Sequence, residues 1–276
     1  MKWYKYLQIL SIDVALGACC MAYFISRILE IQTPYVVYFS LAMSVWLIYT
    51  IDHLMDSRNI EGVALTVRHR YHQKYFRQLS WIWLVLFLVT GVISILYLPT
   101  ITIKVGLLAA IMVIVHLVLV YLLGNKISIL IQKELGVAIT YSVGVVIGPL
   151  SLNHGIPVYI WWVVVQIFLY AFINLLEFSY FDNEIDREHG QTSIAQSIGK
   201  LTLEKIIKGV VITGAFLNFY CFFSFPNYFI FQLILFFVFS TLALIIYKKE
   251  NFSNNGYYRL FGDLVFLYPC ILLIIE

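Results

Sequence analysis

Charged residues are scarce in this sequence. Asp, Glu, Lys and Arg make up 12% of its 276 residues, while 62% are hydrophobic and the mean hydropathy is +0.88. Soluble domains carry roughly 25% charged residues, so the composition argues against a soluble protein. A helix needs about 20 mostly apolar residues to cross a hydrocarbon core of about 30 Å, and such runs recur along the chain. We therefore expect an integral membrane protein.

Cysteine is also rare, and its placement gives no cysteine motif. All four cysteines lie inside apolar runs, with no Cys-x-x-Cys pair and no histidine nearby at ligand spacing: Cys19, Cys20, Cys221 and Cys270. We interpret all four as small buried residues.

Linker segments are lacking too. No Gly/Ser-rich or Pro-rich stretch and no low-complexity tract divides the chain, so residues 1–276 are expected to form a single transmembrane domain. The start, with Lys2 and Lys5, resembles the basic flank of a signal sequence. The apolar segment that follows is long and has no small-residue cleavage site, so we interpret it as the first retained span.

The apolar runs predict nine transmembrane helices. They lie near residues 7–28, 35–51, 80–98, 100–123, 129–152, 157–180, 206–225, 228–247 and 259–275. Strands of membrane barrels alternate apolar and polar residues, whereas runs such as Leu107 to Leu123 are apolar throughout. The expected fold is all-α, a polytopic membrane protein with its helices in one bundle.

Lysine and arginine gather in every second connection. They precede span 1, follow spans 2, 4, 6 and 8, and are absent from the opposite connections except for Arg27 between spans 1 and 2. Because basic residues mark the cytoplasmic side, the N-terminus is predicted to be cytoplasmic and the C-terminus to lie on the opposite side. The two long connections, residues 57–78 and 183–204, are then both cytoplasmic.

Two pairs of aspartates stand at the predicted cytoplasmic ends of spans 2 and 6. Asp52 and Asp56 form the first pair, and Asp182 and Asp186 form the second. Residues four apart lie on one face of a helix, where like charges repel, and carboxylates near hydrocarbon are costly. A hard cation would compensate, and Mg²⁺ binds one or two carboxylates while keeping positions for substrate phosphates. We predict that all four aspartates are magnesium ligands, although solvated helix ends are the simpler alternative.

Basic residues follow each aspartate pair and could bind the phosphates of a substrate. These residues are Arg58, Arg68, Arg70 and Lys74 after the first pair, and Arg187 and Lys200 after the second. A diphosphate leaves from an allylic carbon only if its developing charge is neutralised, and arginine can grip phosphate oxygens in two places. The membrane orientation rule alone would also place these residues here.

The segments around both aspartate pairs resemble motifs of a known family. The stretch from Phe181 to Gly199, an Asp-x-x-x-Asp followed by a short loop with Gly, Thr and Lys, resembles the second aspartate motif of the UbiA superfamily of membrane prenyltransferases. The cluster at residues 49–58 resembles that family's first motif. It departs from the motif at Ile48, where Asn is usual, and at Tyr49, where a further Asp is common.

The resemblance implies a magnesium-dependent intramembrane prenyltransferase with a cavity that faces the cytoplasm. Such an enzyme transfers a prenyl group from a prenyl diphosphate to a lipophilic acceptor, for example an aromatic one. Lys133 in span 5 is similar to a basic residue of the family and is expected to reach the diphosphate. Asn174 and Tyr180 in span 6 are expected to line the pocket, with Glu177 one turn from Asn174.

Three other functions are compared with a prenyltransferase. A membrane terpene cyclase of the same superfamily would use the same diphosphate site without an acceptor, and the altered first motif favours such a divergent activity. An ion-coupled transporter could also use membrane carboxylates, but the aspartates cluster at one face and not at the midplane. No nucleic-acid-binding motif is present. Asp13 and Asp263, both intramembrane, are interpreted as caps of interhelical contacts.

Overall fold

The computed structural model describes the chain except residues 1, 61, 124–126, 154, 189–192 and 276, and except the side chains of residues 2–3, 59, 119–123, 127–133 and 255. The bundle begins with two helices, α1 (Lys2–Ile9) and α2 (Ile12–Ile28). Its long helices are α3 (Tyr35–Asn59), α5 (Phe76–Tyr97), α6 (Thr100–Leu123), α7 (Ile127–Ser151), α8 (Val158–Glu188), α10 (Lys200–Ser224) and α11 (Phe229–Tyr247). The last helical segment consists of α13 (Tyr257–Leu264), η3 (Val265–Ile271) and α14 (Leu272–Ile275). Short helices connect them: α4 (Val67–Lys74), α9 (Ile194–Ile198), η1 (Pro226–Tyr228), α12 (Lys249–Ser253) and η2 (Asn254–Gly256). The described residues contain no strand, so the all-α prediction is confirmed.

Eight helical stretches of the described chain are long and apolar enough to cross a membrane. They correspond to α3, α5, α6, α7, α8, α10, α11 with η1, and the segment from α13 to α14. The chain is therefore an integral, multi-pass membrane protein. Half of the residues in an 18-residue apolar stretch of α8 are buried inside the bundle, whereas the share is 11% in α5 and in α6. Helix α8 is therefore central, and α5 and α6 lie at the outside.

The first predicted span is not one continuous helix. It breaks after α1, because Ser11 adopts a left-handed conformation with φ of 54°, which a residue with a Cβ rarely adopts within a helix. Two polar contacts accompany the break: the buried Ser11 Oγ lies 3.1 Å from His53 Nε2 on α3, and the partly buried Tyr4 hydroxyl donates to Asp13 at 3.3 Å. The remaining helix α2 has 17 residues and is not among the eight stretches long enough to cross a membrane, so the described part of the chain has eight candidate spans where nine were expected.

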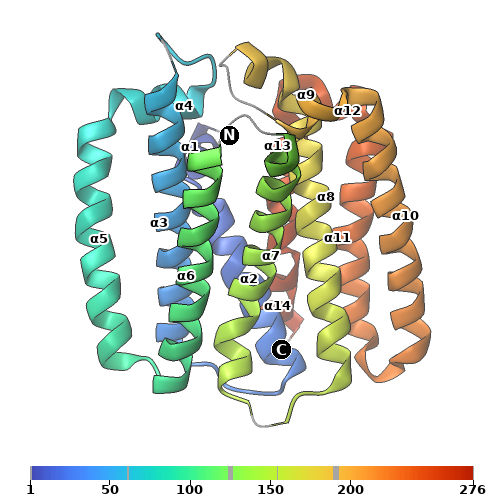
Figure 1. The fold of residues 1–276 in the computed structure, drawn as a ribbon. Helices are drawn as coiled ribbons and strands as arrows, with labels where there is room; N and C mark the ends of the chain where they lie inside the picture. Colours follow the sequence, from blue (N-terminus) through green and yellow to red (C-terminus); the bar gives the residue numbers. More distant parts are fainter. Residues whose placement is uncertain (1, 61, 124–126, 154, 189–192, 276) are drawn as a thin grey trace.

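Both aspartate pairs lie at one end of the bundle. Figure 1 shows α4, α9 and α12 at the end where the N-terminus lies, and the C-terminus toward the opposite end. The helices that carry the pairs are longer than expected, since α3 continues to Asn59 and α8 to Glu188. Each aspartate pair is therefore helical, and the two long connections share one side, as predicted. Which side faces the cytoplasm stays a prediction from the sequence.

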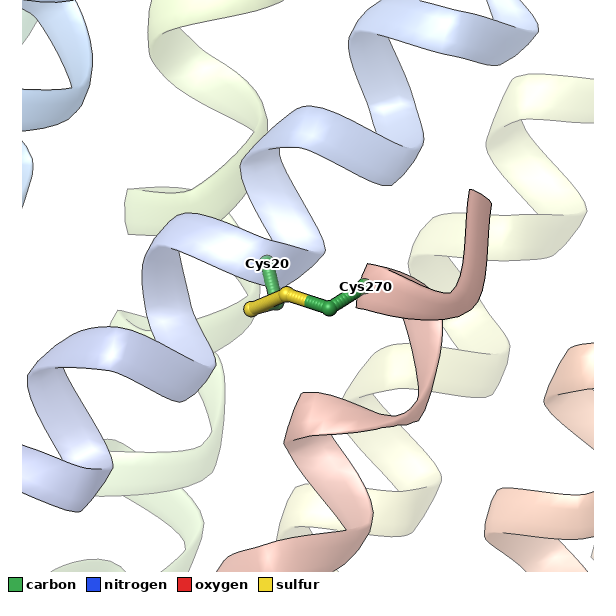
Figure 2. The surroundings of a disulfide bond; sticks show 2 residues. All are labelled: Cys20 and Cys270. Carbon is green, nitrogen blue, oxygen red and sulfur yellow. A yellow bond between two sulfur atoms is a disulfide. The ribbon is translucent and has the colours of Figure 1, made fainter. Parts of the chain in front are cut away.

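A disulfide joins the two ends of the chain. Cys20 on α2 is bonded to Cys270 on η3, with 5.4 Å between the Cα atoms and a sequence separation of 250 (Figure 2). The interpretation of all four cysteines as small buried residues is therefore wrong for this pair, while Cys19 and Cys221 are free thiols. Local spacing could not reveal the bond, because only the packing of η3 against α2 brings the two residues together.

Replacing Cys20 by serine is expected to lower the stability of the detergent-purified protein by about 2–4 kcal/mol, because the bond restrains the unfolded chain. Thermal unfolding with and without reductant would measure this, and reductant should have no further effect on the variant. The neighbouring free thiol offers a matched control, since Cys19→Ser should keep the parent's response to reductant. Equal alkylation of Cys20 with and without prior reduction would show that no bond forms.

Candidate functional site

A cavity of about 80 Å³ lies inside the bundle near the aspartate-bearing end of α8. Its wall combines four polar side chains with aromatic ones: Arg68 from α4, Asn174 from α8, and Arg259 and Asp263 from α13, together with Tyr49, Tyr141, Phe178 and Phe266. Charged groups are expensive within a bilayer and usually mark a functional site. This cavity is therefore the candidate site.

Asp182, one of the predicted magnesium ligands, is bound by the neighbouring helix α13. The carboxylate is buried, its Oδ1 accepts a hydrogen bond from the Tyr258 hydroxyl, and its Oδ2 accepts one from the Arg259 guanidinium in an ion pair. The same guanidinium lies over the Phe178 ring, 5.0 Å from its centroid. The salt bridge and the ring contact together fix Arg259 between Asp182 and the cavity.

The other three aspartates, Asp52, Asp56 and Asp186, are partly buried at the ends of α3 and α8. In the part of the chain that the structure describes, no three His, Cys, Asp or Glu side chains come close enough together to hold a metal ion. Helices α2, α7 and α13 link α3 to α8 through their mutual contacts. The structure thus brings the two pairs to one end of the bundle but does not gather them into one cluster.

The donor set still fits magnesium in its chemistry. Each pair supplies only hard carboxylate oxygens, and each oxygen of Asp182 can accept a second partner beside its hydrogen bond. A cation at Asp182 would, however, lie next to the positive charge of Arg259. Cation binding and the ion pair therefore compete for the same carboxylate.

Arg68 is the residue of the first basic loop that reaches the cavity. It lies on α4 and interacts electrostatically with Arg259, Asp263, Asp13 and Asp182. Burial, followed by the nearby Arg259 charge, lowers the pKa of Arg68 below its usual range, but a guanidinium stays charged in proteins. The cavity thus holds two arginines, and the carboxylates around them offset their repulsion.

Arg70 and Lys74, grouped with Arg68 in the sequence, have other surroundings. Arg70 is exposed, and its guanidinium donates to the carbonyl oxygens of Ala64 at 3.1 Å and Leu65 at 3.3 Å. Lys74 is exposed, with its ammonium 5.2 Å from the centroid of the Tyr75 ring. Neither residue lines the cavity, so the structure separates Arg68 from the rest of the predicted phosphate lid.

Of the other predicted site residues whose side chains the structure describes, Asn174 lines the cavity and Arg58, Arg187 and Tyr180 do not. Arg58 and Arg187 are exposed at the ends of α3 and α8, and the side chain of Lys133 lies outside the described part of the structure. Asn174 lines the cavity, as expected, and within the described residues its Oδ1 has no hydrogen-bond partner. Tyr180 was expected beside it but lies elsewhere, with its hydroxyl 3.4 Å from Glu204 on α10.

Sequence reasoning missed the contribution of α13. Arg259 is one of the basic residues after span 8 that predict the membrane orientation, and no role is predicted for Tyr258. Asp13 and Asp263 are costly intramembrane carboxylates, and from the sequence they are interpreted only as caps of interhelical contacts. The spacing of Arg259 and Asp263, four residues apart and so on one helix face, was the available signal.

A group of histidines holds α4 over the site. The buried His53 on α3 packs against His72 and His69 on α4, with ring centroids 5.2 and 6.2 Å apart, and His72 Nδ1 hydrogen-bonds to the carbonyl of Arg68 at 2.9 Å. Burial lowers the pKa of His72. The neutral form of the His72 ring is therefore favoured when α4 is packed against α3.

Docking of α4 is expected to weaken in acid. Because the pKa of His72 is lower in the folded protein, its contribution to stability is complete above the unfolded value of about 6.5 and is lost as the pH falls from that value through the lower folded pKa. Limited proteolysis of residues 60–75 should be faster at about pH 5.5 than at about pH 7.5. A His72→Gln variant, which cannot gain the proton, should show a smaller difference; an unchanged difference would exclude His72 as the cause.

Comparison with known proteins gives a clear structural result. No family model matches the sequence, and no curated protein matches it. Among solved structures, a UbiA homologue from Archaeoglobus fulgidus bound to DMAPP and Mg²⁺ aligns with a TM-score of 0.64 at 12% identity, over 99% of this chain and 100% of that one. The structure of a UbiA homologue from the same organism bound to GPP and Mg²⁺ aligns with a TM-score of 0.64 at 13% identity, over 98% and 99%.

The alignments cover almost all of both chains, and at this level of identity they establish the fold. The resemblance that the aspartate motifs predicted is thereby confirmed for the architecture. This chain is a multi-pass membrane protein with the UbiA fold.

Proposed function

We propose that the protein is a magnesium-dependent membrane enzyme that acts on a prenyl diphosphate and transfers the prenyl group to a lipophilic acceptor. The observation that carries the proposal is the cavity, where Arg68 and Arg259 lie beside an aromatic wall and next to Asp182. Arginines suit a diphosphate, and aromatic rings suit a prenyl chain. The solved structures that share the fold are bound to DMAPP or GPP with Mg²⁺, which agrees with this chemistry.

Magnesium, held by Asp52, Asp56, Asp182 and Asp186, would supply the positive charge that stabilises a departing diphosphate. Arg68 and Arg259 hold the phosphate oxygens at the polar part of the cavity wall. The allylic C–O bond breaks, and its electron pair leaves with the diphosphate. The faces of Tyr49 and Phe178 stabilise the resulting cation and exclude water, until an electron pair of the acceptor forms the new bond. The acceptor then loses a proton, which the departing diphosphate can accept.

A terpene cyclase is the second candidate, and one observation favours it. Tyr49, which stands where the family's first motif commonly has an Asp, lines the cavity and adds an aromatic face in place of a carboxylate. In a cyclase the cation would be captured by a double bond of its own prenyl chain, and the cyclised cation would then lose a proton to give a hydrocarbon or add water and lose a proton to give an alcohol, so no acceptor is needed.

One assay tests the function and distinguishes the two candidates. The purified protein is incubated with GPP and Mg²⁺, with and without an aromatic acceptor, and released diphosphate and organic products are measured. A transferase needs the acceptor, whereas a cyclase releases a hydrocarbon or terpene alcohol without it. The absence of any diphosphate release, with EDTA-treated protein as the blank, would contradict both candidates; ion flux in liposomes would then favour a carrier.

Arg68→Ala is expected to weaken GPP binding about ten-fold or more, because a charge-assisted hydrogen bond to phosphate contributes about 1.5–3 kcal/mol. Arg70→Ala is the matched control, since Arg70 is a neighbouring basic residue whose partners are loop carbonyls. GPP saturation curves at fixed Mg²⁺ measure both. Saturation curves of both variants that match the parent's would show that the basic loop only sets membrane orientation.

A further inference from the structure

Arg259 occupies a position from which it can serve two partners. Its guanidinium is paired with Asp182, and the same side chain lines the cavity. The side chain of Asp182 is 10% exposed and that of Arg259 is 31% exposed, so the pair is shielded but not sealed on the arginine side. The Phe178 ring, 5.0 Å away, gives the guanidinium an apolar face to rest on in either position.

Two arginines in one cavity prefer a multiply charged anion. Arg68 and Arg259 repel each other electrostatically, and Asp263, Asp13 and Asp182 offset that repulsion in the structure. An entering diphosphate would offset it more strongly, since each guanidinium can form two parallel bonds to phosphate oxygens. The anion would therefore draw Arg259 away from Asp182.

We propose, on the basis of the proposed function, that Arg259 is a substrate-binding residue that exchanges partners. Without a diphosphate it pairs with Asp182, and with a diphosphate it binds the phosphate oxygens and leaves the carboxylate to the cation. The exchange makes cation binding depend on diphosphate binding, and the dependence is reciprocal. It limits the capture of a cation by Asp182 when no substrate is present.

Tyr258 allows the two parts of this mechanism to be separated. Its hydroxyl donates to the other oxygen of Asp182, and it is not part of the cavity wall. Removing that hydroxyl frees an acceptor position on Asp182 without changing the groups offered to a phosphate. Removing the guanidinium changes both.

The test measures binding by isothermal titration calorimetry on the detergent-purified full chain, with MgCl₂ alone and with GPP at saturating Mg²⁺. Arg259→Gln is expected to bind Mg²⁺ about ten-fold more tightly and GPP about ten-fold more weakly than the parent. Tyr258→Phe should gain about three-fold in Mg²⁺ affinity and keep the parent's GPP affinity. Lys205→Gln, which removes an exposed positive charge at the start of α10, should change neither.

Opposite changes in the two affinities of Arg259→Gln support the exchange. Parallel weakening of both would overturn it, because that pattern belongs to a residue that only holds α13 against α8. Unchanged affinities would overturn it as well. If Arg259→Gln fails to fold, Arg259→Lys takes its place, since lysine keeps the charge but not the two-point grip on phosphate oxygens; Mg²⁺ and GPP affinities that both match the parent's, or that both fall, then decide against the proposal. The parent's own binding of GPP tests the proposed function separately, before any variant is compared.

Discussion

Asp182→Asn is expected to reduce diphosphate consumption at least about a hundred-fold while the protein remains folded. The substitution keeps the size of the side chain and removes the negative charge that a cation requires. Loss of an outer-shell partner of a metal ligand typically costs 10- to 100-fold, and loss of a ligand itself costs more, because the metal provides most of the charge stabilisation of the leaving group. Asp52→Asn, Asp56→Asn and Asp186→Asn are expected to act in the same direction.

The helix that carries Asp182 also provides the control. Glu184 is an exposed carboxylate between Asp182 and Asp186 on α8, so Glu184→Gln removes the same charge from the same end of the bundle. Diphosphate release at saturating GPP is measured as a function of Mg²⁺ concentration, with thermal unfolding as the test of folding. Full turnover by any two of the four aspartate variants would overturn the assignment of these residues as metal ligands.

Asn218→Leu is expected to destabilise the protein by about 2–5 kcal/mol. The Oδ1 of this buried residue on α10 accepts hydrogen bonds from Tyr170 at 3.0 Å, Gln232 at 2.9 Å and Gln166 at 3.4 Å, and so connects α10 to α8 and α11. Leucine would leave the three donors without an acceptor, at about 1–3 kcal/mol each in a water-soluble core, or about 3–9 kcal/mol in all. Interhelical hydrogen bonds in membranes contribute less, about 0.6 kcal/mol on average or about 2 kcal/mol for three, so the expected range runs from that value into the lower part of the first one.

Thermal or denaturant unfolding in detergent measures the effect. Thr213→Val on the same helix is the control, because Thr213 is exposed and donates only to the carbonyl of Gly209, one turn earlier in its own helix. Its expected change is within about 0.5 kcal/mol. If both variants unfold like the parent, the polar network does not hold these three helices together.

Span positions were predictable because each depends on local composition. Long apolar runs must form helices in a bilayer to satisfy their backbone groups. The observed helices follow the predicted ranges apart from the break at Ser11, the extended ends of α3 and α8, the earlier starts of α5 and α10, and the 3-10 helix η3 within the last span. The break could not be predicted, since the Ser11 contact to His53 joins residues 42 positions apart. The Asn218 network has the same origin in contacts between distant helices.

The site was predictable only in part. Four-residue spacing places Asp182 and Asp186 on one helix face from sequence alone, and its place in the long basic connection after the first aspartate pair identifies Arg68 as a candidate. Nothing local distinguishes Arg68 from Arg70, because their difference is the direction of each side chain once α4 packs onto α3. Sequence order also hides Arg259, which lies 77 residues from Asp182.

The sequence by itself determined the membrane location, the helical class, and the placement of both aspartate pairs at one end of the bundle, because hydrophobicity and helix periodicity are properties of neighbouring residues. Only the tertiary structure decided which charges meet: Arg259 with Asp182, Arg68 beside the cavity, and Cys20 with Cys270. Each of these pairings depends on how α2, α4, α8 and the α13 to α14 segment pack against one another. Long-range electrostatic and covalent contacts follow from that packing, which no local pattern encodes.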